Sequence, residues 1–166
     1  MKRILFYVIV GLQALFLVGM SVAFYLIDLV GEEAKLKTLP VDPQDPFYGD
    51  YLTLRYEAEE IDPVKWKISS EMESGDKVFV TLAENEDGIY QVEEVTAEPP
   101  GISSGQVMLT GFYQYYSDFE NLYYVDYGLN RYYIEDNTGL EIEQSGELIV
   151  TVAIAPWGQK KIVTIE

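Results

Sequence analysis

Residues 4–27 read ILFYVIVGLQALFLVGMSVAFYLI, an apolar run without a charged side chain, directly preceded by Lys2 and Arg3. A helix rises about 1.5 Å per residue, so this run is roughly 36 Å long and spans a hydrocarbon core of about 30 Å with some tilt. Every backbone amide is paired within such a helix, as lipid requires. The sequence therefore predicts one transmembrane helix, followed by an acidic remainder of the chain.

The charges that flank the apolar run predict its orientation. Lys and Arg close to a membrane helix are retained in the cytoplasm, whereas acidic residues are translocated with little penalty. Lys2 and Arg3 precede the run, and Asp28 follows it with two glutamates at residues 32–33, although lysines at 35 and 37 reduce the asymmetry. We expect a single-pass protein of the cell membrane with a cytoplasmic N-terminus and an extracytoplasmic C-terminal domain.

A cleavable signal peptide is the competing interpretation of the same run. Residues 21–23, Ser-Val-Ala, have the small side chains that a signal peptidase accepts. The apolar region of a signal peptide is about 7 to 15 residues long, whereas here it continues past that point through residues 24–27. An uncleaved anchor fits better, and the absence of Cys excludes a lipid-modified cysteine after the run.

The composition of the remainder limits its partners and its source of stability. From residue 31 onward there are 9 Lys and Arg against 27 Asp and Glu, a net charge of 9 − 27 = −18. Such a field repels phosphate backbones, so nucleic acid is not an expected partner, and cations or basic proteins are the alternatives to a purely solubilising role. Without Cys there are no disulfides, so a packed core must stabilise a single domain.

Composition also divides the chain into three parts. Residues 1–30 form the expected anchor, residues 31–47 a stalk and proline-rich lead-in, and residues 48–166 the extracytoplasmic β-domain. The segment 31–38 is expected to prolong the helix by a turn or two or to act as a stalk. Three prolines between residues 39 and 46 then end it, because proline favours an extended backbone at and before its own position.

Strand-like alternation dominates the β-domain. From residue 51, Leu52, Leu54 and Tyr56 fall on one side and polar side chains on the other, which is typical of a half-buried strand. Two hairpins are predicted, around Asp87-Gly88 and around residues 156–158. The predicted fold is all-β or β-dominated, an antiparallel sandwich or partly closed barrel after one N-terminal transmembrane helix; short helices are expected only within 57–74 or 136–146. The further strands are expected at 77–83, 89–97, 106–115, 122–127, 131–134, 147–155 and 160–165.

A family resemblance rests on three blocks of sequence. Residues 49–56, GDYLTLRY, match every fixed position of the motif that names the GDYXXLXY family of bacterial proteins. Residues 41–46, VDPQDP, resemble the lead-in of that family, and residues 127–135, YGLNRYYIE, its downstream block. The chain departs from the family at Gln44 and Tyr48, which replace arginines, and at Asp136. The matching residues are Asp42, Pro43, Asp45, Gly49, Asp50, Tyr51, Leu54, Tyr56, Tyr127, Gly128, Tyr133 and Glu135.

The resemblance implies a place more than an activity. It implies a bacterial, membrane-anchored, extracytoplasmic domain, often encoded beside or fused to multi-pass membrane proteins, and it implies no particular reaction. On physical grounds the motif is a turn that leads into a strand, with Gly49 permitting a tight bend. The functional alternative is a carboxylate cluster of Asp42, Asp45 and Asp50 that binds a cation such as calcium, or a basic ligand.

Aromatic side chains are unusually dense between residues 112 and 133. On a strand, successive rings such as Tyr113 and its neighbours face opposite sides, so some must pack in a second layer or lie at a surface. Core and cross-strand packing is the simpler interpretation. Exposed tyrosines, with Tyr113, Tyr115 and Tyr123 as candidates, would instead bind a protein partner or stack on sugars.

Catalytic side chains are scarce. The chain contains no His and no Cys, which excludes Ser-His-Asp and Cys-His catalysis and imidazole or thiolate metal sites. A Ser-Lys hydrolase is disfavoured because no Ser lies between Ser21 and Ser69, where a membrane-anchored peptidase would need it. A carboxylate enzyme has no pair of acids that stands out. We therefore expect no enzyme activity and no cofactor.

The apolar helix itself carries the remaining signal for a partner. Gly19 and Ala23 form a small-xxx-small pair, and Gln13 is a polar side chain near the middle of the span, where a hydrogen-bonding neighbour is favoured over lipid. The expected function is that of an accessory or scaffolding subunit of a membrane complex, with a multi-pass membrane protein as its partner. The alternative is an ectodomain that binds a cell-envelope carbohydrate or a cation.

Overall fold

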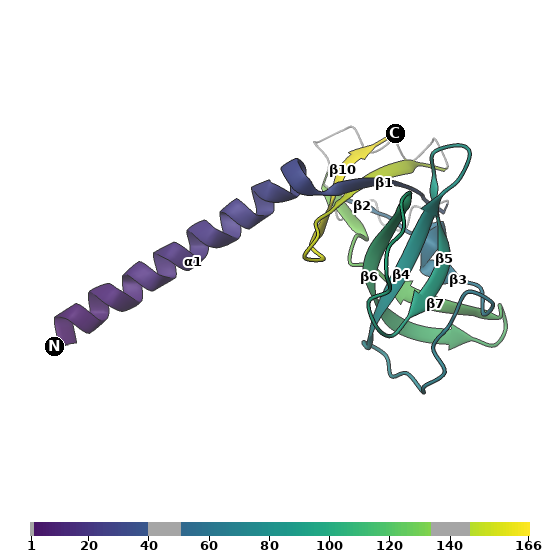
Figure 1. The fold of residues 1–166 in the computed structure, drawn as a ribbon, viewed down its shortest axis with the longest axis horizontal. Coiled ribbons are helices and arrows are strands. Elements are labelled where there is room, and N and C mark those ends of the chain that lie inside the picture. The colour runs from purple at the N-terminus through teal and green to yellow at the C-terminus, as the bar shows by residue number, and fades with distance from the viewer. Residues whose placement is uncertain (1, 40–50, 134–146) are drawn as a thin grey trace.

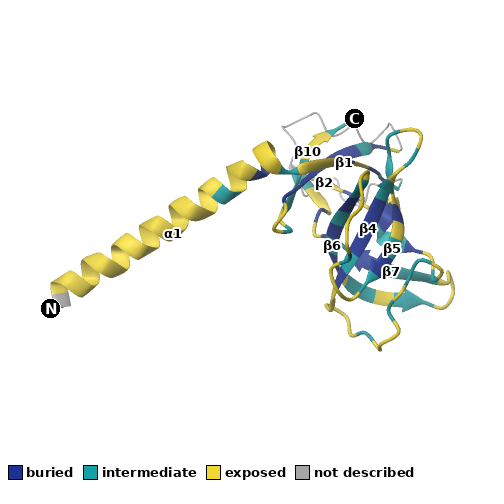
Figure 2. Ribbon diagram, viewed as in Figure 1, coloured by how far each residue is buried: buried dark blue, intermediate teal, exposed yellow. Residues whose placement is uncertain are grey.

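One long helix projects from a β-domain in the computed structural model, which describes residues 2–39, 51–133 and 147–166 (Figure 1). Helix α1 spans Lys2–Val30 and has no acidic residue in its first turn and no basic residue in its last. Its side chains are exposed along almost the whole length (Figure 2). Among the described residues it is the one helix long and apolar enough to cross a membrane, which agrees with the predicted span.

The domain is built from short antiparallel strands in three sheets, which confirms the predicted β-dominated fold. The sheet orders are β1-β9-β10, β2-β8 and β3-β7-β6-β4-β5. In the described residues the only helical segment of the domain is one 3-10 turn, η1, at Glu57–Glu59. The strands are β1 Glu32–Lys37, β2 Tyr51–Thr53, β3 Glu60–Ile61, β4 Lys77–Glu84, β5 Tyr90–Thr96, β6 Gln106–Ser117, β7 Leu122–Asp126, β8 Arg131–Tyr133, β9 Ile149–Ile154 and β10 Lys160–Ile165.

Both predicted hairpins are present. Strands β4 and β5 pair around a turn in which the Asn85 side chain accepts the N–H groups of Asp87 and Ile89, and Gly88 has a φ of +78°. Strands β9 and β10 pair around residues 155–159, where Gly158 has a φ of +88°. A positive φ costs Gly nothing, which is why both turns end in that residue.

The segment after the helix differs from its expected structure. Residues 31–38 neither prolong the helix nor form a stalk; they contain strand β1, which pairs antiparallel with β9. Ala34 and Leu36 point into the core and are fully buried, whereas Glu33 and Lys35 between them are exposed. The alternation covers only two apolar residues among charged ones, so the sequence of this segment did not predict a strand. Its apolar face is defined by the pairing with β9.

One hydrophobic core joins the three-stranded and five-stranded sheets. Strand β9 is central in its sheet and is buried on both faces. Alternate residues of β4 and β6 supply the opposite side, as the period of two along a strand dictates. Figure 2 shows the buried strands gathered where these sheets face each other. The fully buried members include Ala34, Leu36, Val78, Val80, Leu82, Leu109, Val150 and Val152.

The helix enters the domain without an intervening linker. The N–H of Gly31 still donates to the carbonyl of Ile27 at 2.9 Å, and β1 starts at the next residue. A Cβ on Gly31 would lie 2.5 Å from the Ile27 carbonyl oxygen, so this position requires Gly. Ile27 is buried against Ala153 and Ala155 of the β9 region. The end of α1 is therefore packed onto the domain.

Candidate functional site

The two motif blocks predicted from sequence lie side by side. Strand β2, from the GDYLTLRY block, pairs antiparallel with β8, from the downstream block, with Tyr51 opposite Tyr133. One residue further on, the N–H of Leu54 donates to the carbonyl oxygen of Asn130 at 2.9 Å. Two segments separated by more than seventy positions are thus joined backbone to backbone.

Two tyrosine hydroxyls link the blocks in a reciprocal way. The Tyr56 hydroxyl donates to the Leu129 carbonyl oxygen at 3.0 Å, and the Tyr127 hydroxyl donates to the Ala58 carbonyl oxygen at 2.5 Å. Both tyrosines are among the largest fully buried side chains. We call Leu54, Tyr56, Ala58, Tyr127 and Leu129 the motif junction. A buried hydroxyl must find an acceptor, and here each segment supplies the carbonyl oxygen that accepts from the tyrosine of the other.

Two glycines give the junction its shape. Gly128 has a φ of +68°, and its N–H donates to the Asp126 carboxylate at 2.6 Å, an Asx-type turn between β7 and β8. Gly111 on β6 lies beneath the Tyr127 ring, with ring carbons 3.1 Å from the position that a Cβ would take. The first glycine bends the chain, and the second leaves room for the ring.

Six of the predicted motif residues lie outside the described residues. Tyr51 and Tyr133 are described by their backbone pairing alone. The proposed carboxylate cluster is among the undescribed positions, so cation binding there stays a prediction. In the described part of the chain, no three acidic side chains come together in a way that would hold a metal ion. The six residues are Asp42, Pro43, Asp45, Gly49, Asp50 and Glu135.

Charged side chains surround the motif junction. Glu59 accepts the Tyr56 N–H at 3.1 Å, and burial raises the pKa of its carboxyl to about 7, with a further contribution from Asp126. Lys160 of β10 donates to the Thr110 carbonyl, and burial lowers the pKa of its ammonium to about 8. Its Nζ atom lies 5.9 Å from the centroid of the Tyr127 ring. The β9–β10 hairpin thus contacts the junction.

Glu59 makes the stability of the domain depend on pH. Its pKa of about 7 in the fold lies above the ordinary 4.5 of a glutamate, so its contribution to stability is complete below about pH 4.5 and is lost as the pH rises through 7. A Glu59→Gln variant keeps an oxygen for the Tyr56 N–H and does not ionise. We expect the variant to be more stable than the native chain above pH 7 by about 2 kcal/mol, allowing for solvent screening of this half-buried group.

Melting temperatures measured from pH 4.5 to 8 test this expectation. Glu86→Gln, in the exposed β4–β5 turn, is the matched control and should retain the native decline. An equal decline in Glu59→Gln and in the native protein would show that Glu59 does not titrate in this range.

The predicted aromatic partner surface divides between the two faces of its sheet. Tyr113 and Tyr123 pack against Trp66, whose ring stacks on Tyr123 with centroids 4.2 Å apart. Tyr115 faces the other side, where it is 54% exposed and stacks on Tyr124 at 4.7 Å. An irregularity in the β6–β7 pairing between Tyr113 and Tyr115 shifts the alternation. Of the three candidates, Tyr115 is the exposed one.

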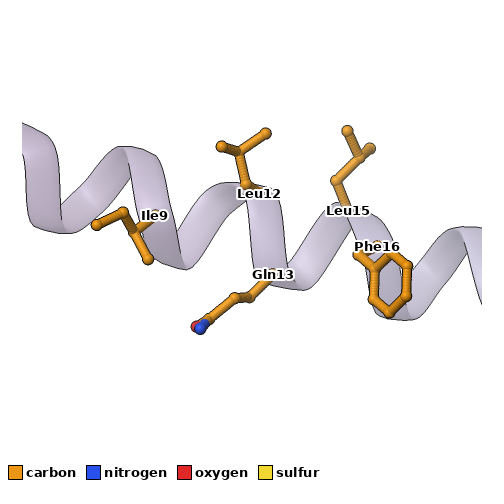
Figure 3. Close-up of a pocket in the computed structure, with 5 residues that line it drawn as sticks. All are labelled: Ile9, Leu12, Gln13, Leu15 and Phe16. Atoms are coloured by element: carbon orange, nitrogen blue, oxygen red, sulfur yellow. The ribbon is translucent and has the colours of Figure 1, made fainter.

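The predicted partner face of the helix is exposed at Gln13 and Gly19, whereas Ala23 is half-buried. Figure 3 shows Gln13 extending from a different side of α1 than Leu12 and Leu15. No hydrogen bond to Gln13 is present among the described residues, and the span around it is unburied. Gly19 and Ala23 lie further along α1, and a Cβ on Gly19 would have open space around it.

The sequence interpretation missed Glu59, Lys160 and the contact between helix and hairpin. Glu59 follows Tyr56 by three residues, the spacing at which a carboxylate accepts the N–H at the start of a helical turn, so a signal was present. Lys160 carries no local signal, since its burial depends on β6 and Tyr127. The ion pair between Asp28 and Lys161, at 2.5 Å, joins positions at opposite ends of the chain.

The comparisons with known proteins agree with the motif. No curated protein matches the chain, and no solved structure matches it. The family model described as GDYXXLXY protein matches residues 13–165, which include most of the helix, both motif blocks and both hairpins. The chain therefore belongs to the GDYXXLXY protein family.

Proposed function

We propose that this protein is an accessory or scaffolding subunit of a membrane complex, held by α1 and placing its β-domain outside the cytoplasm. The observation that carries the proposal is Gln13, a polar side chain near the middle of the span with no partner in the described chain. Lipid offers an amide no hydrogen bond, whereas a neighbouring helix does. The proposed partner is a multi-pass membrane protein.

The packing of the helix end supports a scaffolding role. Because Ile27 is buried against β9 and Asp28 pairs with Lys161, the domain holds one orientation relative to α1. A subunit that positions a partner benefits from such a junction. Gln13 also lies on the helix stripe of Phe24 and Ile27, which are eleven and fourteen positions away, about three and four turns.

The proposal also includes two further points: nucleic acid is not a partner, and α1 crosses the membrane with its N-terminus in the cytoplasm. The net charge of −17 opposes binding to phosphate backbones. Arg3 marks the cytoplasmic end of α1, and Asp28 with the acidic start of β1 marks the outer end. Leu54, Tyr56 and Tyr127 of the motif are buried in the junction, so they shape the domain, and the predicted surfaces left for a partner are the helix and the exposed aromatic face.

Photo-crosslinking in the native membrane tests the proposal. A photoreactive residue at position 13 is expected to trap a multi-pass protein, and one at position 15, on another side of the helix (Figure 3), to trap far less of it. Gln13→Leu should reduce co-purification of that protein in mild detergent about tenfold, since a membrane hydrogen bond contributes about 1 to 2 kcal/mol.

The same cells report the orientation and the alternative function. An Asp87→Cys variant, the only cysteine in its chain, should react with a membrane-impermeant maleimide added outside. A protein that purifies alone, with equal crosslinking at both positions, would overturn the subunit proposal and favour an ectodomain that binds a carbohydrate or a cation. Labelling that occurs only after cell lysis would show that the β-domain lies in the cytoplasm and would contradict the proposed orientation.

A further inference from the structure

The β9–β10 hairpin points toward the membrane side of the domain. Strand β9 runs antiparallel to β1, and its last residue, Ile154, lies opposite Glu32, the first residue of β1. The chain then continues through residues 155–159 before Lys160 returns opposite the same Ile154. This tip therefore extends past the start of β1, on the side from which α1 arrives, as Figure 1 shows.

Three contacts hold the hairpin against the last two turns of α1. Lys161 forms an ion pair with Asp28 at 2.5 Å, and its Nζ atom lies 4.8 Å from the centroid of the Phe24 ring. Ile27 is buried against Ala153 and Ala155. The position of the hairpin along the helix axis is therefore set by packing, by charge and by a cation–π contact.

These contacts also set the depth of the helix in the bilayer. Asp28 and Lys161 are charged and belong outside the hydrocarbon layer. Below Phe24 about 20 residues of α1 remain, from position 4 to position 23, and they span about 30 Å, the thickness of a hydrocarbon core. Tyr7 and Tyr25 lie near the two ends of that span, where tyrosine is enriched at membrane interfaces. The outer boundary of the hydrocarbon thus falls near Phe24.

The tip has the side chains that suit a lipid headgroup layer. Trp157 is 48% exposed, and its indole N–H donates to the Gln159 side chain at 2.8 Å. Tryptophan favours this layer because its ring is apolar and its N–H is polar. In a domain with 27 acidic residues, positions 148–165 contain none. The hairpin is therefore a surface that anionic lipids do not repel.

We propose that residues 155–159 form a second membrane contact, with Trp157 seated among the lipid headgroups. The contact rests on the proposed function, since it requires α1 to span the bilayer. With the helix and the hairpin both in contact with lipid, the domain cannot tilt freely about the end of α1. The face of the domain that a partner meets is then fixed relative to the membrane plane.

Depth-dependent quenching of tryptophan fluorescence tests this contact in the full-length protein. The chain has two tryptophans, so Trp66→Phe leaves Trp157 as the only reporter and Trp157→Phe leaves Trp66 as the matched control. Each variant is reconstituted in vesicles of phosphatidylcholine with a minority of phosphatidylglycerol. Nitroxide lipids labelled at the headgroup or shallow in the acyl chain should quench Trp157 severalfold more than deep labels do, and should leave Trp66 unchanged.

The outcomes separate this inference from the proposed anchor. Strong quenching of Trp157 by aqueous acrylamide, with none by labelled lipid, would overturn the contact. Carbonate extraction of the same vesicles shows whether α1 spans them: retention without lipid quenching rejects only the hairpin contact, whereas release rejects the anchor and the contact together. If Trp66→Phe fails to fold, Trp157→Cys carrying a polarity-sensitive fluorophore reports the same depth in a chain without other cysteines.

Discussion

A Gly111→Ala variant is expected to lose about 3 kcal/mol of unfolding free energy, the upper range for an overpacked core. A Cβ at this position would lie 2.3 Å from the Cγ1 atom of Val125 and 3.1 Å from two carbons of the Tyr127 ring. Both neighbours are buried, and Tyr127 is also held by its hydrogen bond to Ala58. Neither side chain has space to move, because protein interiors are close-packed.

Thermal unfolding of the full-length protein in detergent measures this effect, as a fall in melting temperature of about 10 °C. Gly101→Ala is the matched control, since nothing lies within 4 Å of the added methyl and no positive φ is required there. We expect it to change stability by less than about 1 kcal/mol. Equal melting temperatures for the two variants would contradict the close packing of β6 against Tyr127.

Replacing both junction tyrosines, Tyr56→Phe with Tyr127→Phe, is expected to cost about 3 kcal/mol. Each change keeps the ring and removes one hydroxyl, leaving a buried carbonyl oxygen, on Leu129 or on Ala58, without that donor. The loss of one partner of a buried hydrogen bond costs about 1 to 3 kcal/mol. The motif tyrosines therefore stabilise the junction through their hydroxyls as well as their rings.

The two single variants and the double variant form a thermodynamic cycle. Both bonds connect the same two segments, so we expect a coupling of about 0.5 kcal/mol or more, with the second removal costing less than the first. Tyr115→Phe is the control, because that ring is exposed and its hydroxyl makes no hydrogen bond in the described part of the chain. A double variant as stable as the control would exclude a structural role for the hydroxyls.

Local patterns predicted the elements whose signal lies within a few residues. The buried Leu54 and Tyr56 alternate with the exposed Arg55, as the period of two predicted, although strand β2 itself ends at Thr53. The hairpin at Gly88 followed from turn chemistry, and the helix followed from the length of its apolar run. In each case the physical cause, either backbone geometry or the hydrophobicity of successive side chains, is contained in the segment itself.

Strand β1 and the aromatic faces could not be predicted in the same way. Ala34 and Leu36 are two apolar residues among charged neighbours, and their burial depends on β9, more than a hundred positions away. The faces of Tyr113 and Tyr115 depend on one irregularity in the pairing of β6 with β7, and a shift of one residue moves side chains to the opposite face. The sequence of a strand by itself gives little indication of where its pairing with a neighbouring strand will shift.

By itself the sequence determined that a long apolar helix precedes an acidic β-domain of the GDYXXLXY family, because hydrophobicity, charge and short motifs are local properties. Only the tertiary structure decided what the motif and the helix contact. Tyr56 and Tyr127 each donate a hydrogen bond to a carbonyl of the other's segment, and Lys161 forms an ion pair with Asp28. Strand pairing brings these distant positions together. The energy of those contacts depends on distance in space and on burial, and neither can be read from separation along the chain.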